Sequence, residues 1–299
     1  MIALADEAKI AAGLELAADR NELFMLYQPK ICVETGELAG VEALMRWHSA
    51  DFGLLPPSLF VPIAERSGTI DVITEWGARH VLRQWTDWRD QGLKTNIAIN
   101  ISALSLRDIH FPDFLQRLCH VEGMPCDHLT IEVTEGATQH AVRLLDTITR
   151  FRIKGMNVEL DDFGTGYSSL LQLRQLPYTA LKIDSCFVAD AAENPEARLI
   201  VKTVIDLAHG LGLTATAEGV ERGETLELLR TLGCDHAQGF LISEPLSPAE
   251  LVPWVMRSAG KWRALYRPAA EADPVRGEAD AALGPPGTRA RNSSSSSLH

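Results

Sequence analysis

Short runs rich in β-branched and aromatic residues recur along this chain, and helical stretches separate them. We expect eight such runs to form strands, at residues 24–33, 38–47, 95–102, 129–135, 157–163, 180–185, 214–220 and 236–241. Amphipathic segments lie between them, several of which end in a glycine: 67–89, 111–123, 138–155, 196–212 and 223–233. This alternation predicts an α/β fold with a parallel sheet. Eight units over about 250 residues have the size of a (β/α)₈ TIM-type barrel, although an open doubly wound sheet fits the count as well.

Polar side chains stand near the ends of the expected strands, from the second strand onward. They are Glu42, Asn100, Glu132, Asp161, Asp162, Lys182, Glu218 and Gln238. Charged residues are costly to bury without a partner, so carboxylates in apolar runs must neutralise something. The C-terminal strand ends of a (β/α)₈ barrel converge on one face, which carries the active site. This placement favours the barrel over the open sheet and predicts an active site at that face.

Carboxylates outnumber cations five to one in this set, because Lys182 is its only positive residue. Such a surplus of negative charge needs metal ions or shared protons to balance it. Oxygen donors without matching cysteines or histidines suit Mg²⁺ or Mn²⁺, with Ca²⁺ as an inactive, inhibitory competitor. So many carboxylates predict two ions, roughly 3.5–4 Å apart, and phosphodiester hydrolysis is the reaction that such a pair serves best.

Each of these residues also has a purely structural interpretation. Glu42 alone fits a satisfied buried ion pair, and Lys182 fits a lysine with a buried stem whose ammonium reaches water. Gln238 alone fits a loop hydrogen bond, and Asn100 fits a turn at a strand end. Only their joint arrangement favours a functional site.

The segment from Asp161 to Leu170, DDFGTGYSSL, is the most informative single stretch. Gly164 and Gly166 form a mobile turn directly after the paired aspartates, and the serines behind them can cap the next helix. We interpret this turn as a gating loop that closes over a substrate, held by hydrogen bonds to Glu135. A plain strand-to-helix connection is the alternative.

The composition narrows the classes of partner. A formal net charge of −12 with no basic patch argues against a nucleic-acid partner. The five cysteines include no CxxC pair, which predicts neither a disulfide framework nor a zinc ribbon and fits a reducing compartment. No apolar run of membrane-spanning length is free of charge, so we expect a cytoplasmic protein without a membrane segment.

Three parts are expected along the chain. Residues 1–20 predict an amphipathic helix that leads into the barrel, and the barrel covers 21–266. Residues 267–299 are rich in proline, alanine, glycine, acids and finally serine, so we expect a disordered tail. The serine run near its end resembles a cloning remnant rather than native sequence.

The motifs, taken in order, closely resemble those of the EAL family of cyclic di-GMP phosphodiesterases, named after the tripeptide found here at 42–44. The similar segments are YQP at 27–29, EALMRW at 42–47, AINIS at 98–102, EVTE at 132–135, DDFGTGYSS at 161–169, LKID at 181–184, AEGVE at 217–221, and QGF at 238–240 with Pro245. Each segment is weak alone, but eight in register are specific. The resemblance implies a barrel with one antiparallel strand, and hydrolysis of cyclic di-GMP to linear pGpG.

The resemblance also implies roles for individual residues. The expected metal ligands are Glu42, Asn100, Glu132, Asp161, Asp162 and Glu218. Lys182 is similar to the residue that holds the nucleophilic water, Glu218 to the proposed general base, and Glu42 joins them in the catalytic set. The expected substrate-binding residues are Gln28, Arg46, Asp184, Glu221, Gln238 and Pro245, and the planar fork of Arg46 suits a phosphate. The family also implies a homodimer.

Three positions depart from the usual pattern of the family. Phe240 stands where tyrosine is frequent, and Glu244 stands where a basic residue is common before the proline. Glu159 falls on the same side of its strand as Asp161, deeper in the barrel, and would need a basic partner that the sequence does not identify.

Two other functions stay open beside the active enzyme. Some family members have lost metal ligands and act as receptors, so a catalytically weak or inactive cyclic di-GMP receptor is the alternative. All metal-site and catalytic positions are intact here, which favours the enzyme. The third hypothesis is a scaffold whose strand-end acids are structural, in which case metal should neither bind nor raise the melting temperature.

Overall fold

The computed structural model describes residues 4–135, 141–164 and 170–258. The chain divides into two compact units, 1–266 and 267–299, and every described residue lies in the first. The expected tail therefore lies outside the described residues. Within the described part, none of the helices combines the length and the apolar character that a membrane crossing demands.

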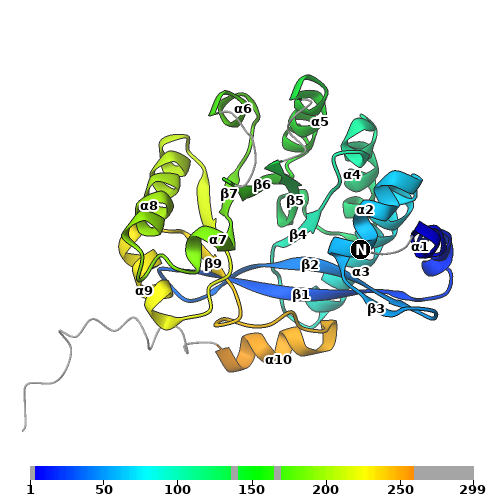
Figure 1. Cartoon of the computed structure of the whole chain (residues 1–299), viewed down its shortest axis with the longest axis horizontal. Helices are drawn as coiled ribbons and strands as arrows, with labels where there is room; N and C mark the ends of the chain where they lie inside the picture. The colour runs from blue at the N-terminus through cyan, green and yellow to red at the C-terminus, as the bar shows by residue number, and fades with distance from the viewer. Residues whose placement is uncertain (1–3, 136–140, 165–169, 259–299) are drawn as a thin grey trace, which may run out of the picture. The chain divides into compact units, whose positions relative to one another are not determined.

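Eight strands close a barrel (Figure 1). In their order around the ring they are β1 (Leu23–Cys32), β9 (His236–Gln238), β8 (Thr214–Ala217), β7 (Ala180–Ile183), β6 (Asn157–Phe163), β5 (Leu129–Thr134), β4 (Ile97–Asn100) and β2 (Leu38–Ser49), which pairs back with β1. Strand β1 is antiparallel to both neighbours, and the other pairs in the ring are parallel. The predicted α/β barrel with one antiparallel strand is confirmed, and the open sheet is excluded because the ring is closed.

Helices surround the strands. They are α2 (Pro57–Ser67), α3 (Ile70–Asp90), α4 (Phe111–Glu122), α5 (Ala141–Ile153), α6 (Leu170–Gln175), α7 (Ser185–Val188), α8 (Pro195–Gly210), α9 (Gly223–Leu232) and α10 (Pro248–Ser258), with 3₁₀ turns η1 (Ser105–Arg107) and η2 (Cys126–His128). The five predicted helical segments correspond to α3, α4, α5, α8 and α9. Helix α6 is the helix expected behind the serines of DDFGTGYSSL. The sequence did not predict α2, α7, α10 or the short β3 (Gly53–Leu55), which forms a hairpin with β2.

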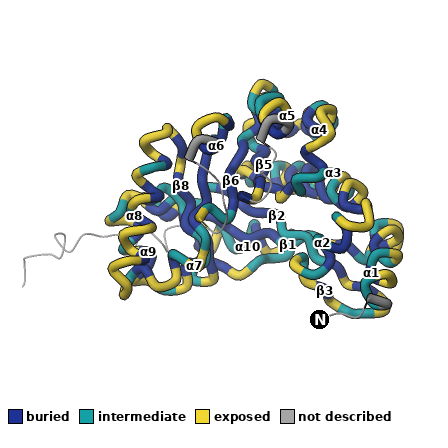
Figure 2. Tube along the Cα trace, turned by 45° about the horizontal axis from the view of Figure 1, so that its top comes forward, coloured by how far each residue is buried: buried dark blue, intermediate teal, exposed yellow. Residues whose placement is uncertain are grey.

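The main hydrophobic core lies between the strands and the helices. In β5, Leu129, Ile131 and Val133 belong to this core, and Thr130 and Glu132 alternate with them. Because successive side chains of a strand point to opposite faces, this alternation turns the polar pair toward the barrel interior. Figure 2 shows the buried strands at the centre and exposed outer sides on the surrounding helices. The apolar side chains of the strands thus face the core between strands and helices, and the polar side chains face the barrel axis.

Helix α1 (Leu4–Ala17) packs on a smaller core beside the barrel. Its Ile10, Leu14 and Ala17 are buried at helical spacing, in one cluster with Trp47 of β2 and Phe60 of α2. Helix α1 thus covers Leu4–Ala17 of the segment 1–20 in which the sequence predicts a helix.

Candidate active site

A buried lysine organises the C-terminal end of the barrel. Lys182 of β7 is 1% exposed, and its Nζ lies among four carboxylates from β2, β5, β6 and the end of β8. The distances from Nζ are 2.7 Å to Glu218 Oε1, 3.1 Å to Asp161 Oδ1, 3.2 Å to Glu132 Oε1 and 3.5 Å to Glu42 Oε2. Its ammonium does not reach solvent, so the interpretation of Lys182 as a lysine with a solvated head is excluded.

Side-chain amides hold Glu42 from both sides. Asn100 Nδ2 donates to Glu42 Oε1 at 2.7 Å, and Gln238 Nε2 donates to Glu42 Oε2 at 2.7 Å. Gln238 Nε2 also lies 3.1 Å from Gln28 Oε1, and Gln28 Nε2 donates to the Ser243 carbonyl at 3.1 Å. The antiparallel β1 makes this possible because Gln28 pairs in register with Glu42. Four strands thus fix the orientation of one carboxylate.

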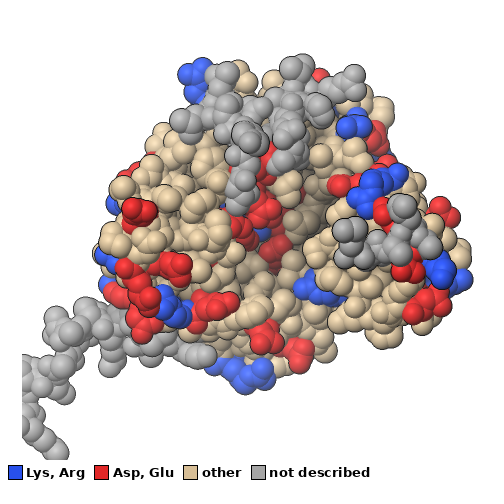
Figure 3. Space-filling model, in the orientation of Figure 1, with Lys and Arg blue, Asp and Glu red and all other residues tan. Residues whose placement is uncertain are grey.

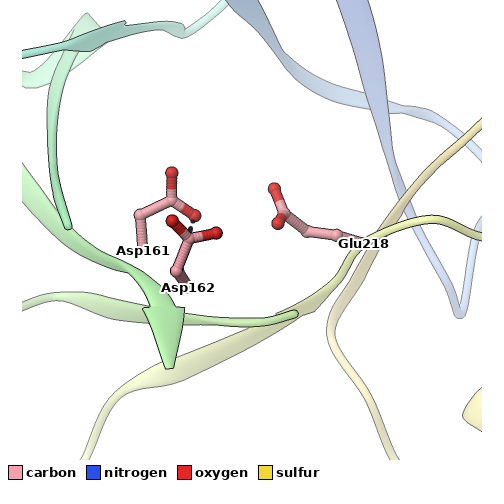
Figure 4. A group of neighbouring side chains, drawn as sticks. All are labelled: Asp161, Asp162 and Glu218. Atoms are coloured by element: carbon pink, nitrogen blue, oxygen red, sulfur yellow. Dashed lines mark hydrogen bonds between the residues drawn. The ribbon is translucent and has the colours of Figure 1, made fainter. Parts of the chain in front are cut away.

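Three acids form a second group at the mouth of the barrel. Asp161, Asp162 and Glu218 each offer a carboxylate oxygen, and these atoms lie within 4.8 Å of one another. Figure 4 shows the two aspartates, at the end of β6, facing Glu218 across the opening. Asp162 has a φ of +56°, in the left-handed region that non-glycine residues rarely adopt. This strained turn presents two consecutive residues of a strand to the same opening.

Hydrogen bonding separates the acidities of two equally deep carboxyls. Burial raises the pKa of Glu132 well above its usual value, and the charge of Glu42 adds to the shift. Burial alone would also raise the pKa of Glu42, but Lys182 and the amide donors Gln238 and Asn100 outweigh it and lower that pKa. Glu132 lacks such donors, so it holds a proton more readily than Glu42 does.

The carboxyl groups nearer the mouth of the barrel have pKa values close to neutral pH. Burial raises the pKa of Glu218 to about 7 despite the opposing charge of Lys182. Burial, with the charge of Asp161, raises the pKa of Asp162 to about 6. Burial lowers the pKa of Lys182, but the surrounding carboxylates outweigh it and raise that pKa well above its usual value. The cluster therefore holds one permanent positive charge and more acids than that charge can balance.

The residues present fit divalent cations. Glu132 Oε2 is buried and has no hydrogen-bond partner among the described residues, so a second ligand oxygen is left over in the most buried acid. All donors in the cluster are carboxylate or amide oxygens, which are the ligands of Mg²⁺ and Mn²⁺. Figure 3 shows acidic side chains gathered in a hollow at the middle of this face. An uncompensated acidic hollow of oxygen donors is a metal-competent site.

Glu135 contacts the turn that the sequence predicts as a gate. It is buried, and its Oε2 accepts a hydrogen bond of 3.0 Å from the backbone N–H of Gly164. Gly164 has a φ of +100°, and a Cβ there would lie 2.8 Å from the ring of Phe187, so only glycine fits. Gly166 lies outside the described residues, and loop closure stays a prediction.

A cavity of about 840 Å³ extends from the acids toward an apolar wall. Its polar end includes Glu42, Asn100 and Asp161, and its wall includes Leu44 and Pro57. The cavity thus combines oxygen donors at one end with an apolar wall at the other, a combination that is common in small-molecule sites.

Two further residues of this cavity were missed by the sequence analysis. Ser102 Oγ donates to Glu65 Oε1 of α2 at 2.6 Å, and both line the cavity. Helix α2 was not predicted, and the two residues meet only through packing. The proline at the first helical position, Pro57, was the signal that could have found α2.

The other four residues that are predicted to bind substrate lie apart from this cavity. Arg46 is half-buried, and its Nη1 donates to the Met45 carbonyl at 2.9 Å. Asp184 caps α7 by accepting from the Cys186 N–H at 2.8 Å. Glu221 is exposed and Pro245 is half-buried. These four line no part of the 840 Å³ cavity, so their substrate contacts stay predictions.

The three unusual residues have different surroundings. Phe240 and Glu244 are exposed. Glu159 lies deeper in the barrel than Asp161, and the structure supplies its basic partner from β1: Lys30 Nζ lies 3.0 Å from both carboxylate oxygens.

The fold and the site together define an α/β barrel protein with an acidic, metal-competent centre at the C-terminal strand ends. The chain belongs to the EAL domain family, whose model matches residues 11–245.

Relatives with assigned names support this family. A cyclic di-GMP phosphodiesterase of Pseudomonas aeruginosa is 38% identical over 250 residues, which are 83% of this chain and 43% of that protein. The cyclic di-GMP phosphodiesterase PdeR of Escherichia coli is 37% identical over 246 residues, 82% of this chain and 37% of that protein. The chain thus spans less than half the length of the curated relatives that it matches.

Solved structures agree with the fold. The c-di-GMP complex of the PaMucR phosphodiesterase superposes with a TM-score of 0.77 at 37% identity, covering 81% of this chain and 99% of that chain. The EAL enzyme Bd1971, in its form with cAMP and cyclic di-GMP bound, superposes with a TM-score of 0.80 at 30% identity, covering 84% of this chain and 69% of that one.

Proposed function

We propose that this site hydrolyses one phosphodiester of cyclic di-GMP to give linear pGpG, with two divalent cations as cofactors. The single buried ammonium of Lys182 among four carboxylates carries the proposal, because it leaves negative charge for cations to balance. The printed names of the relatives support cyclic di-GMP as the substrate.

The proposed ions are Mg²⁺ or Mn²⁺, and Ca²⁺ is expected to bind and inhibit. The residues that would hold them are Glu42, Asn100, Glu132, Asp161, Asp162 and Glu218. Such ions would supply positive charge to the attacking and leaving oxygens at phosphorus. The amide contacts to Glu42 and the strained turn at Asp162 would hold these ligands in place for the ions.

Two residues of the cluster would act on the attacking water. Lys182 would donate a hydrogen bond to it and offset the charge of the phosphate. Glu218 would accept its proton, because burial places the pKa of this carboxyl at about 7, where both protonation states are populated near neutral pH. The guanine bases would then lie along the apolar wall, with Arg46 available to a phosphate oxygen.

Turnover measured with cyclic di-GMP in Mg²⁺, Mn²⁺ and Ca²⁺ tests the proposal, with Glu42→Ala as the control. We expect pGpG to form with Mg²⁺ and Mn²⁺, none with Ca²⁺, and almost none from Glu42→Ala. If cyclic di-GMP binds tightly and stays intact at saturating Mg²⁺ and Mn²⁺, the protein is a receptor and the proposal fails.

We also propose that the protein acts as a homodimer in the cytoplasm, as the family resemblance implies. Light scattering during size-exclusion chromatography gives the molar mass directly. A mass of one chain at micromolar concentration would refute the dimer.

A further inference from the structure

The cavity of about 840 Å³ touches both faces of β2. Glu42 and Leu44 line it, and so do the alternate residues Ala43 and Met45. Successive side chains of a strand point to opposite faces, so Ala43 and Met45 lie on the face that turns away from the acids. Ala43 accordingly belongs to the core between strands and helices. The cavity therefore has one part at the mouth of the barrel and another part outside the barrel wall.

The part outside the wall, here called the outer compartment, lies between the β1–β2 pair and the helices α2 and α3. Figure 1 shows both helices beside this pair. Met25 of β1 is in register with Met45, and Ile99 of β4 is in register with Ala43, so these side chains share the outer face. The residues that line the outer compartment are Met25, Ala43, Met45, Ile70, Ile73, Thr74, Gly77, Ala78, Ile99 and Ile101.

One face of α3 forms the wall opposite the two methionines. The lining residues 70, 73, 74, 77 and 78 follow the spacing of a single helix face. Gly77 lies inside this helix, where glycine is less favourable than alanine. A Cβ at Gly77 would lie 2.8 Å from Met25 Cε and 3.0 Å from Met45 Cε. The glycine thus leaves room where the helix meets the two methionine side chains.

The outer compartment lies at the boundary of the two hydrophobic cores. Ala78 belongs to the main core, and Ile73 belongs to the smaller core that α1 packs on. Protein interiors are packed as densely as organic crystals, so the space at this boundary is one that the surrounding side chains do not fill. Methionine is unbranched and polarizable and adapts to the shape of a guest. Met25 and Met45 therefore suit the wall of a binding site.

The lining favours an apolar ligand. Of the residues named as its lining, Thr74 alone has a polar side chain. A guanine base carries hydrogen-bonding groups around its edge, and most of them would be left unpaired against this wall, which is costly. An aromatic hydrocarbon ring has no such groups and gains free energy from burial. Apolar cavities in proteins bind small molecules of this kind.

We propose that the outer compartment is a second binding site, separate from the acids, and that its ligand is a compact apolar molecule or group such as a single aromatic ring. The ligand enters from the mouth of the barrel, because the same cavity includes Asp161 and Asp162. It contacts β2 at Ala43, directly beside Glu42. This inference does not rest on the proposed function.

The methyl groups of the methionines report occupancy directly. Toluene is the probe, and carbon-13 methyl NMR of the metal-free protein is the measurement. Toluene should shift the resonances of Met25 and Met45, and it should leave those of Met124 and Met156, which are buried but do not line the cavity. Phenol has nearly the same shape with a hydroxyl and should bind more weakly. If toluene shifts neither Met25 nor Met45 up to its solubility limit, the proposal fails.

Two glycines in helices give a matched pair of variants. Gly77→Ala places a methyl group against Met25 and Met45, so the affinity for toluene should fall by about tenfold. Gly13→Ala is the control, because its Cβ would lie 3.2 Å from the Trp47 ring but outside the cavity, and its affinity should equal that of the wild type. Equal affinity in Gly77→Ala would overturn the site.

A variant that widens the outer compartment keeps the test decisive if Gly77→Ala does not fold. Met25→Ala removes a side chain from the wall, so the larger p-xylene should bind more tightly than to the wild type. The absence of any gain would contradict the proposal.

Saturating cyclic di-GMP separates this site from that of the nucleotide. Toluene should stay bound in its presence, whereas displacement of toluene would place a base in the outer compartment and overturn a separate site. A protein that binds toluene but no nucleotide would refute the proposed function and leave this inference standing.

Discussion

Two buried lysines at opposite ends of the barrel axis have contrasting surroundings. Lys30, toward the N-terminal ends, contacts both oxygens of one carboxylate at 3.0 Å, that of Glu159. Lys182, toward the C-terminal ends, lies within 3.5 Å of four carboxylates. The first pair is electrically balanced, and the second cluster carries an excess of negative charge.

This difference teaches which buried charges are structural. A one-to-one pair satisfies itself and requires only that neither partner be removed. In a cluster with more acids than bases, repulsion between the carboxylates lowers the stability of the fold until cations bind. Such a cost is expected at functional sites. Mutations at the two ends of the barrel should therefore differ in effect: those at the Lys182 cluster should lower activity, and those at the Lys30–Glu159 pair should lower stability.

Asp161→Ala should cause the largest loss of activity. A catalytic ligand supplies several kcal/mol of transition-state stabilisation, so we expect kcat/KM to fall by roughly 10³-fold or more. The melting temperature of the metal-free protein should be kept, because the change removes one of several repelling acids. Steady-state turnover with Mg²⁺ gives kcat/KM, and circular dichroism gives the melting temperature. If the Asp161→Ala protein is active, Asp161 is not a metal ligand.

Glu159→Ala should show the opposite behaviour. It leaves the Lys30 ammonium buried and unpaired, so the free energy of unfolding should fall by about 3–5 kcal/mol while kcat per folded molecule is retained. Urea denaturation measures the loss. The control is the double variant Lys30→Met with Glu159→Leu, which should recover most of the stability. A single variant as stable as the wild type would contradict a structural pair.

Divalent cations should stabilise the Lys182 end alone. At a free concentration of 100 times Kd, Mg²⁺ should add about 2.7 kcal/mol to the free energy of unfolding. Asp161→Ala should lose this gain, whereas the variants at Glu159 should keep it. Thermal melts with and without EDTA test this, and a wild type that does not respond to metal would support the scaffold hypothesis.

Metal affinity should rise with pH through the range of 6 to 7. In the metal-free protein the pKa values of Asp162 and Glu218, about 6 and about 7, lie above their usual range, so protons compete with the ion below those values. We expect Mg²⁺ to bind about tenfold more weakly one pH unit below pH 7, and a plateau above it. Calorimetry in buffers of different ionisation enthalpy should detect proton release; equal affinity at both pH values would refute the linkage.

Glu135→Gln should have the smallest effect. It weakens the hydrogen bond to the Gly164 N–H without removing a predicted metal ligand, so we expect a several-fold higher KM for cyclic di-GMP or for metal, on the order of 1 kcal/mol. The stability of the fold should not change. Kinetics identical to the wild type would leave Glu135 with a purely local structural role.

The strands of the barrel could be predicted from the sequence because each strand has its own local pattern of residues. All eight predicted strands are present, and the polar residues at their ends meet as expected around Lys182. Alternation along β6 also placed Glu159 correctly below Asp161. The strands are short and clearly bounded by turns, so their identity does not depend on distant residues.

Contacts between side chains that are far apart in the sequence could not be predicted. Glu159 and Lys30 are 129 residues apart, and the contact between Gln238 and Glu42 spans 196 residues. Both contacts depend on closure of the ring by the antiparallel β1. The short β3 was missed because its three residues show no periodicity and gain a partner only by pairing with β2. Helix α2 was missed although its first residue, Pro57, is a local helix-start signal.

The sequence by itself determined the strands, the surplus of carboxylates at their ends and the family, because periodicity and residue type are properties of the chain alone. Only the tertiary structure decided which carboxylate receives hydrogen bonds, which acids titrate near neutral pH and which buried lysine is balanced by a single partner. Those properties depend on distances of a few ångströms and on exclusion of water, and both exist only once the barrel has closed.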